Sequence, residues 1–212
     1  MTKTYVALIA DTVASRALLP KARARLQSDL QAALPLLNRR WRAHLAARFA
    51  VTLGDELQAL FLPGAPLWDI THLLRARFAD VHWVIACGRG PISTPLAPTA
   101  PEVDGPCFHQ ARRALNDAKQ RRLVYAFGGF DPRVEGCAAY YSALYWGWTA
   151  KQRQAALWWR GAPGRGPFQV DIGRRVERMQ PSAVSHMRRR MAWPLVERGD
   201  RMFRDLLEVR AP

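Results

Sequence analysis

Apolar and polar positions alternate along the first 130 residues in a pattern that predicts a mixed α/β domain. The run at 5–10 (YVALIA) is short, apolar and partly β-branched, which is typical of a buried strand, and it ends at Asp11. Pro20 opens an amphipathic helix that extends to about Leu37. Two apolar runs, 49–53 and 57–62, enclose the polar turn Gly54-Asp55-Glu56 and predict a β-hairpin. The other elements expected here are a helix at 67–78, a strand at 81–87, a loop at 88–105, a helix at 107–120 and a strand at 122–127.

The predicted order of these elements is β-α-β-β-α-β-loop-α-β. Its first six elements form the ferredoxin-like split βαβ unit, so we expect an α+β fold with an antiparallel or mixed sheet covered by helices on one face. The turn at 128–133 (GGFDPR) is the best domain boundary, which gives a first domain at 1–130 and a second at 131–212. The second has a helical pattern throughout, with helices expected at 135–148, 150–160, 168–177, 181–193 and from 195 onward.

Charge changes this picture, because the chain carries a net +15. Residues 1–148 hold 18 basic and 11 acidic residues, whereas residues 149–212 hold 14 basic and 6 acidic residues in less than half the length. A basic excess concentrated in one region favours an anionic partner such as double-stranded DNA. The alternative is codon usage, since only four of the 32 basic residues are lysine.

The remaining composition excludes several classes of protein. The longest apolar runs are too short to span a bilayer, and the N-terminal run breaks at Asp11 as a strand would, so we expect no membrane partner and a cytoplasmic location. The three cysteines, Cys87, Cys107 and Cys137, are scattered and form no CxxC pair, which argues against a disulfide framework or a zinc site.

Two aspartates are the strongest candidates for chemistry. Asp11 ends the first predicted strand and Asp55 lies at the tip of the hairpin, and in a split βαβ sheet these two positions are neighbours. Paired carboxylates of this kind can hold Mg²⁺ against a nucleotide triphosphate, with Glu56 as a further ligand. The ordinary alternative is that Asp11 caps a loop and Asp55 makes a turn beside Gly54.

The C-terminal pattern predicts a helix-turn-helix within about 149–193. Residues 169–176 form its expected first helix, and 181–190 form the expected recognition helix, with Pro181 in its first turn. Arginine and small polar side chains on such a helix read base edges or phosphates. The predicted DNA-binding residues are Ser182, Ser185, His186, Arg188 and Arg189. A small helical bundle used for dimerisation or packing is the alternative.

Three segments resemble motifs of class III nucleotide cyclases and GGDEF-type diguanylate cyclases. They are LIADTVASR at 8–16, LGDELQALF at 53–61 and GPCFHQARR at 105–113. The resemblance implies that Asp11 and Asp55 bind metal, and that a later helix supplies an Asn and an Arg four residues apart to stabilise the transition state. Here His109 takes the Asn position and Arg113 the Arg position. Ser15 and Arg16 are placed to meet phosphate oxygens or belong to a solvated loop.

The pattern of the whole chain, over most of residues 4–193, is closer still to the SatD family of bacterial proteins. The shared features are a strand ending in Asp followed by Ser-Arg, the GDELQ hairpin, the Gly-Pro-x-Phe-x-x-Ala-Arg helix and a C-terminal helix-turn-helix. This resemblance implies a cyclase-like domain joined to a DNA-binding domain, and it implies no particular reaction.

Two departures from the cyclase pattern favour nucleotide binding over efficient cyclisation. His109 replaces a neutral amide, and the hairpin has one glycine fewer than the GGDEF doublet. Three functions therefore stay open: a DNA-binding regulator that senses a metal-bound nucleotide, a nucleotide cyclase or nucleotidyltransferase using Mg²⁺, and a structural dimer with a vestigial site. By analogy with cyclase domains, a homodimer is expected.

Overall fold

The computed structural model describes residues 3–13, 19–52, 55–78, 82–160 and 178–208. Their contacts divide the chain into two compact units. Of the described residues, the first contains those up to 65 together with 82–139, and the second contains 66–78, 140–160 and 178–208. The sequence placed a single boundary at 130/131, whereas the structure places residues 66–78 with the C-terminal helices. None of the described helices is long and apolar enough to span a bilayer.

The first unit is built on a five-stranded sheet with the order β2-β3-β1-β4-β5. The strands are β1 (Tyr5–Thr12), β2 (Leu45–Val51), β3 (Leu57–Phe61), β4 (Trp83–Gly90) and β5 (Tyr125–Gly128). Neighbouring strands are antiparallel except for β5, which runs parallel to β4. The α+β class is confirmed, and the first four strands have the order of the split βαβ unit.

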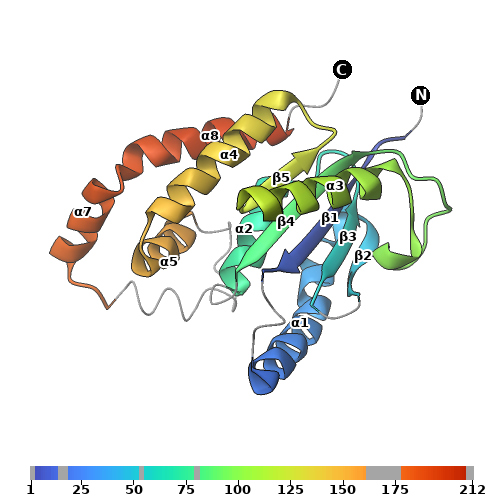
Figure 1. Ribbon diagram of the computed structural model, residues 1–212, viewed down its shortest axis with the longest axis horizontal. Helices are drawn as coiled ribbons and strands as arrows, with labels where there is room; N and C mark the ends of the chain where they lie inside the picture. The colour runs from blue at the N-terminus through green and yellow to red at the C-terminus, as the bar shows by residue number, and fades with distance from the viewer. Residues whose placement is uncertain (1–2, 14–18, 53–54, 79–81, 161–177, 209–212) are drawn as a thin grey trace. The chain divides into compact units, whose positions relative to one another are not determined.

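Helix α3 (Pro106–Arg121) lies directly on one face of the sheet (Figure 1). Alternate residues of β1, namely Tyr5, Ala7 and Ile9, share a buried apolar cluster with Ala111 and Leu115 of this helix. The contact is close because β4 carries Gly88, where an added Cβ would stand 2.1 Å from the carbonyl oxygen of Cys107. The absence of a side chain at this position therefore allows the backbone of α3 to approach β4 closely.

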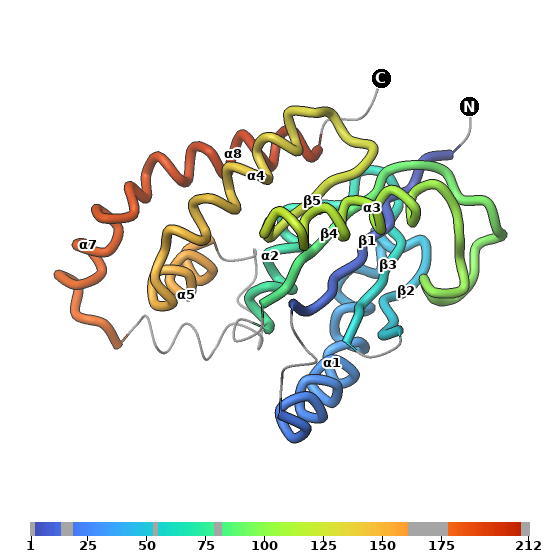
Figure 2. The backbone as a smooth tube through the Cα atoms, viewed as in Figure 1, coloured from blue at the N-terminus to red at the C-terminus, as the bar shows by residue number. Residues whose placement is uncertain are grey.

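Helix α1 (Pro20–Arg40) lies on the opposite face of the sheet. In Figures 1 and 2 its C-terminal end passes behind the strands, and the rest of the helix projects below them. The Asn38 side chain donates to the carbonyl of Phe49 at 3.1 Å and accepts from its N–H at 2.7 Å, which fastens α1 to β2. Phe49 in turn meets Phe61 edge to face, with ring centroids 5.5 Å apart. The expectation that helices cover one face only is therefore wrong, because α3 and α1 pack on opposite faces of the sheet.

The second unit is helical. Its helices are α2 (Leu67–Arg77), the later part of α4 (Pro132–Gly147), α5 (Ala150–Trp159), α7 (Pro181–Arg190) and α8 (Trp193–Glu208). Trp148, Met191 and Trp193 share one buried cluster with Ala156 and Val196.

The helix predicted at 181–193 ends earlier, at Arg190, and the next helix begins at Trp193 rather than at about 195. Ala192 adopts a left-handed conformation with φ of 48°, and Pro194 fits the first turn of α8. The turn allows Met191 and Trp193 to enter the same core. The helix predicted at 168–177 lies outside the described residues.

Candidate functional site

The acidic residues gather at one end of the β1–β3 pair. Ala10 is opposite Leu57 in the antiparallel register, so Asp11 and Glu56 follow at the same end of the two strands. Side chains alternate along a strand, which places Asp11 on the side of Ile9 and Glu56 on the side of Leu60. Both of those apolar residues pack against α3. The two carboxylates therefore extend from the face of the sheet that α3 covers.

Two cations of α3 meet these carboxylates. Lys119 forms an ion pair with Asp11, and Arg112 forms a two-point pair with Glu56 at 2.5 and 2.8 Å. The pairs are only partly shielded from water, since the carboxylate side chains are 19% and 13% exposed and the cations 36% and 44%. Arg112 and Lys119 are seven residues apart, so they project from the same flank of the helix.

Glu56 is held by more than Arg112. Its Oε1 also accepts from Gln58 at 2.7 Å and from the Thr52 hydroxyl at 3.2 Å. Burial alone would raise the pKa of Glu56. The hydrogen bonds that Glu56 accepts from Arg112, Gln58 and Thr52, and the positive charge of Arg112, outweigh burial and lower that pKa below its ordinary value. Glu56 is therefore an anion whose acceptor capacity is largely used within the protein.

Asp55 is in a different condition. It is 8% exposed, and its Oδ2 is buried without a hydrogen-bond partner among the residues that the structure describes. A buried carboxylate oxygen without a partner is costly, and a hydrogen-bond donor or a cation would offset this cost.

The described residues contain no group of three or more His, Cys, Asp or Glu side chains that could hold a metal ion. A magnesium ion bound through one or two carboxylates, with water and phosphate as its other ligands, does not need a third protein ligand. Asp11 and Asp55 are the residues that could hold one.

The other residues predicted to act in this site lie elsewhere on α3. His109 pairs with Asp104 at 3.2 Å, and both side chains are about 60% exposed. Arg113 lines a cavity of about 430 Å³ beside β5 and the start of α4. Within one chain, α3 therefore presents Arg112 and Lys119 to the carboxylates, and the catalytic role of His109 and Arg113 stays a prediction. Ser15 and Arg16 lie outside the described residues.

Sequence motifs missed Arg112 and Lys119 because the resemblance drew attention to His109 and Arg113. The seven-residue spacing places both cations on one flank of the helix. No local pattern indicated which strand that flank faces, because α3 also carries Arg113 and Arg121.

Helix α7 carries the residues predicted to bind DNA. Ser182, Ser185, His186 and Arg189 are exposed on it. Arg188 is less accessible, because it lies 3.6 Å from Glu197 and its guanidinium is 5.4 Å from the centre of the Trp159 ring. The expected first helix of the helix-turn-helix, at 169–176, lies outside the described residues, so the motif as a whole stays a prediction.

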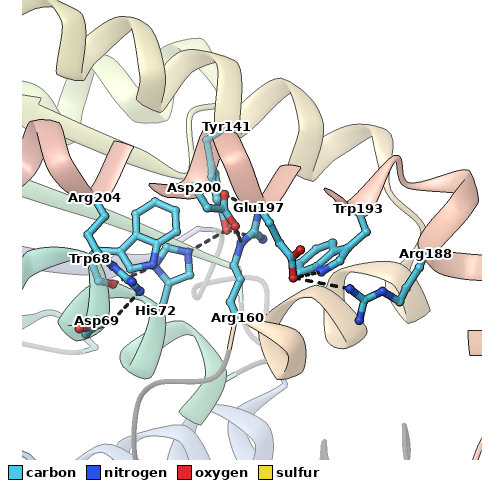
Figure 3. Close-up of polar contacts among 10 residues, drawn as sticks. All are labelled: Trp68, Asp69, His72, Tyr141, Arg160, Arg188, Trp193, Glu197, Asp200 and Arg204. Carbon is cyan, nitrogen blue, oxygen red and sulfur yellow. Dashed lines mark hydrogen bonds and ion pairs between the residues drawn. The ribbon is translucent and has the colours of Figure 1, made fainter. Parts of the chain in front are cut away.

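The helical unit also contains a buried polar network that the sequence did not indicate (Figure 3). Arg160, whose side chain is 3% exposed, binds Asp200 through two contacts of 2.6 and 3.1 Å and donates to the Tyr141 hydroxyl at 3.0 Å. The same hydroxyl is 3.2 Å from Nε2 of His72, whose Nδ1 is 2.8 Å from the carbonyl of Trp68. Since a carbonyl can only accept, Nδ1 carries the proton and Nε2 accepts from Tyr141.

Charge in this network is confined to one pair. Burial and the nearby positive charge of Arg160 lower the pKa of His72 well below its ordinary value, so the imidazole is neutral. Burial raises the pKa of Asp200, although Arg160 acts in the opposite direction. The network therefore serves to position helices α2, α4, α5 and α8 in the unit, and it offers no exposed group for chemistry.

Comparison with known proteins gave one family and two similar structures. The model of the SatD family matches residues 5–125, which run from the start of β1 to the first residue of β5. No curated protein matches the chain. A bacterial light-regulated adenylyl cyclase is 13% identical, with a TM-score of 0.44 over 60% of this chain and 76% of that one. A second structure of a bacterial light-regulated adenylyl cyclase is 15% identical, with a TM-score of 0.43 over 60% of this chain and 43% of that one.

Proposed function

The chain belongs to the SatD family, and from that premise we propose that its first unit binds a nucleoside triphosphate together with Mg²⁺ at the end of β1 and β3. The observation that carries this proposal is the buried Oδ2 of Asp55, which has no hydrogen-bond partner among the described residues. Asp55 directly precedes Glu56 at the strand end that presents Asp11. A single bound cation would offset the charge of Asp55 and bring both carboxylates into one coordination sphere. When bound, the metal would neutralise phosphate charge and fix its orientation.

Binding is a better description of this site than turnover. Among the described residues of the same chain, the cations that pair with Asp11 and Glu56 are Lys119 and Arg112, which suit phosphate recognition. His109 and Arg113, which the resemblance assigns to catalysis, have other neighbours. Catalysis would require a second copy of the chain to supply them. The function that we favour is therefore that of a nucleotide sensor, with the helical unit as the part that responds.

Thermal and urea unfolding with ATP or GTP, with and without Mg²⁺, tests the proposal. A nucleotide present at about 100 times its Kd should add ~2.7 kcal/mol to the free energy of unfolding, and only when Mg²⁺ is present. Asp55→Asn should remove this gain while leaving the ligand-free protein as stable as before or more so, because a buried unpaired charge has been neutralised.

Asp29→Asn is the matched control, because Asp29 is an exposed carboxylate on α1. It should retain the full Mg²⁺-dependent gain. A gain that is the same without Mg²⁺, or that survives in Asp55→Asn, would overturn the proposal.

A second candidate function is DNA binding through α7. The observation that favours it is the exposure of Ser182, Ser185, His186 and Arg189 on a helix that buries none of its residues. In fluorescence anisotropy with a mixed pool of labelled duplexes, affinity should fall steeply with salt. Arg189→Ala should weaken binding and lower the salt slope by about one if Arg189 meets a phosphate. Arg23→Ala, which removes an exposed arginine of α1, should change neither quantity. Equal losses in the two variants would count against α7.

A further inference from the structure

Building on the proposed function, we infer that Arg112 and Lys119 are the phosphate-binding groups of the site. When no ligand is present, these two cations occupy the carboxylates of Glu56 and Asp11 as ion-pair partners. Metal and polyphosphate then bind together, and neither binds well alone. The inference rests on which charges occupy the carboxylates of the folded chain.

The carboxylate of Asp11 is needed as a metal ligand, yet in the structure it is already paired with the ammonium group of Lys119. A divalent ion arriving alone must displace that ammonium group, and it then remains beside an unpaired lysine and close to Arg112. Like charges in a partly buried site repel, so the free ion is disfavoured.

Among the described residues, Asp11 is paired with Lys119 and Glu56 with Arg112. A metal ion that binds Asp11 without phosphate leaves Lys119 without its anion. A metal–triphosphate complex carries its own anionic oxygens, so Lys119 finds a phosphate oxygen when it leaves Asp11. The complex therefore keeps every charged group paired, which neither component does alone.

The two cations of α3 have different roles. Arg112 makes a two-point contact with Glu56, and Glu56 is further fixed by Gln58 and Thr52. Lys119 has one carboxylate contact on a flexible stem, and its side chain is 36% exposed. Lys119 is therefore the group that moves from carboxylate to phosphate, while Arg112 stays in place and offers its remaining N–H groups.

The test uses Mg²⁺ alone and Mg²⁺ with inorganic tripolyphosphate, which has no base or ribose. Titration calorimetry on the full chain should show weak binding of Mg²⁺ alone to the wild type and stronger binding of the combination. Lys119→Gln should change these two affinities in opposite directions. Mg²⁺ alone should bind several-fold more tightly, because its competitor for Asp11 is gone, and Mg²⁺–tripolyphosphate should bind about tenfold more weakly or worse, because a charged contact is lost.

Two matched variants accompany this one. Lys119→Arg keeps the charge and should preserve the preference for the combination. Lys21→Gln removes the charge of an exposed lysine on α1 and should leave both affinities unchanged.

The outcomes separate the two proposals. Opposite changes in Lys119→Gln support the inference. If the wild type binds Mg²⁺–tripolyphosphate through Asp55 but Lys119→Gln lowers both affinities or neither, the inference falls and the proposed function stands. If neither probe binds the wild type or any variant, the inference fails, and the proposed function fails with it where ATP and GTP also give no Mg²⁺-dependent gain in the free energy of unfolding.

Discussion

Replacing Gly88 by alanine should destabilise the first unit by about 3 kcal/mol or more. The new Cβ would stand 2.1 Å from the carbonyl oxygen of Cys107 and 2.2 Å from the amide nitrogen of Ala111. Both atoms are backbone of α3, so no side-chain rotation relieves the overlap, and the whole helix must move away from the sheet. That movement would also separate Lys119 from Asp11 and Arg112 from Glu56.

Urea unfolding followed by tryptophan fluorescence measures this effect, and Gly136→Ala provides the contrast. Gly136 lies in α4, and an alanine Cβ at this position would have nothing within 4 Å. The substitution should therefore raise the free energy of unfolding by about 0.5–1 kcal/mol. If Gly88→Ala were as stable as the wild type, the close packing of α3 on β4 would be contradicted. Nucleotide binding should weaken in Gly88→Ala even under conditions where the chain stays folded.

Arg160→Met should destabilise the helical unit by about 3–5 kcal/mol, because it leaves Asp200 buried without its cation. Arg160 also donates to Tyr141, and its guanidinium lies 4.6 Å from the centre of the Tyr141 ring and 5.5 Å from that of Trp193, so packing is lost as well (Figure 3). Replacing both partners, as in Arg160→Met with Asp200→Leu, should recover most of the loss, since no buried charge then remains.

The pH dependence of the Arg160→Met variant identifies the cause. Burial already raises the pKa of Asp200, and the loss of Arg160 should raise it further. A carboxyl whose pKa is higher in the folded state than in the unfolded state favours folding below the unfolded value, and this contribution disappears as the pH rises through the folded value. The deficit measured by urea unfolding should therefore be smallest in acid and largest at neutral pH.

Arg121→Met is the control for this variant, because Arg121 and Asp117 form an exposed pair on α3. Its effect should stay within about 0.5 kcal/mol. A deficit of that small size in Arg160→Met, or one that does not change with pH, would show that the buried pair contributes little.

The local pattern of the chain was enough to predict the sheet. A strand ending at Asp11 and a hairpin around Asp55 fix the neighbours of β1, because the split βαβ order follows from the sequence of elements. The wrong expectation was that helices cover a single face. The run YVALIA is apolar at every position, which is the signature of a strand buried on both sides, and that signal was available.

Other features were beyond the reach of local patterns. The ion pair between Lys119 and Asp11 joins residues 108 positions apart, and the contact between His72 and Tyr141 joins residues 69 apart. Neither pair shares a motif or a periodicity, because each is created by the packing of one element on another. The position of the break between α7 and α8 is similar, since the sequence predicted it about two residues later and only the burial of Met191 and Trp193 places the turn at Ala192.

Helix α2 follows β3 in the chain but belongs to a unit completed near the C-terminus. During synthesis, Asp69 leaves the ribosome 135 residues before its partner Arg204, an interval of roughly 7–27 s at about 5–20 residues per second. Throughout that interval, Phe203 has not yet been synthesised, so Trp68 of α2 lacks the ring against which it packs in the folded chain. The nascent chain therefore exposes an apolar helix after its sheet is complete, which makes it a substrate for chaperones that hold unfinished proteins. For the same reason, a premature stop after β5 would not release a free N-terminal domain but a chain with an uncovered helix, prone to aggregation and degradation.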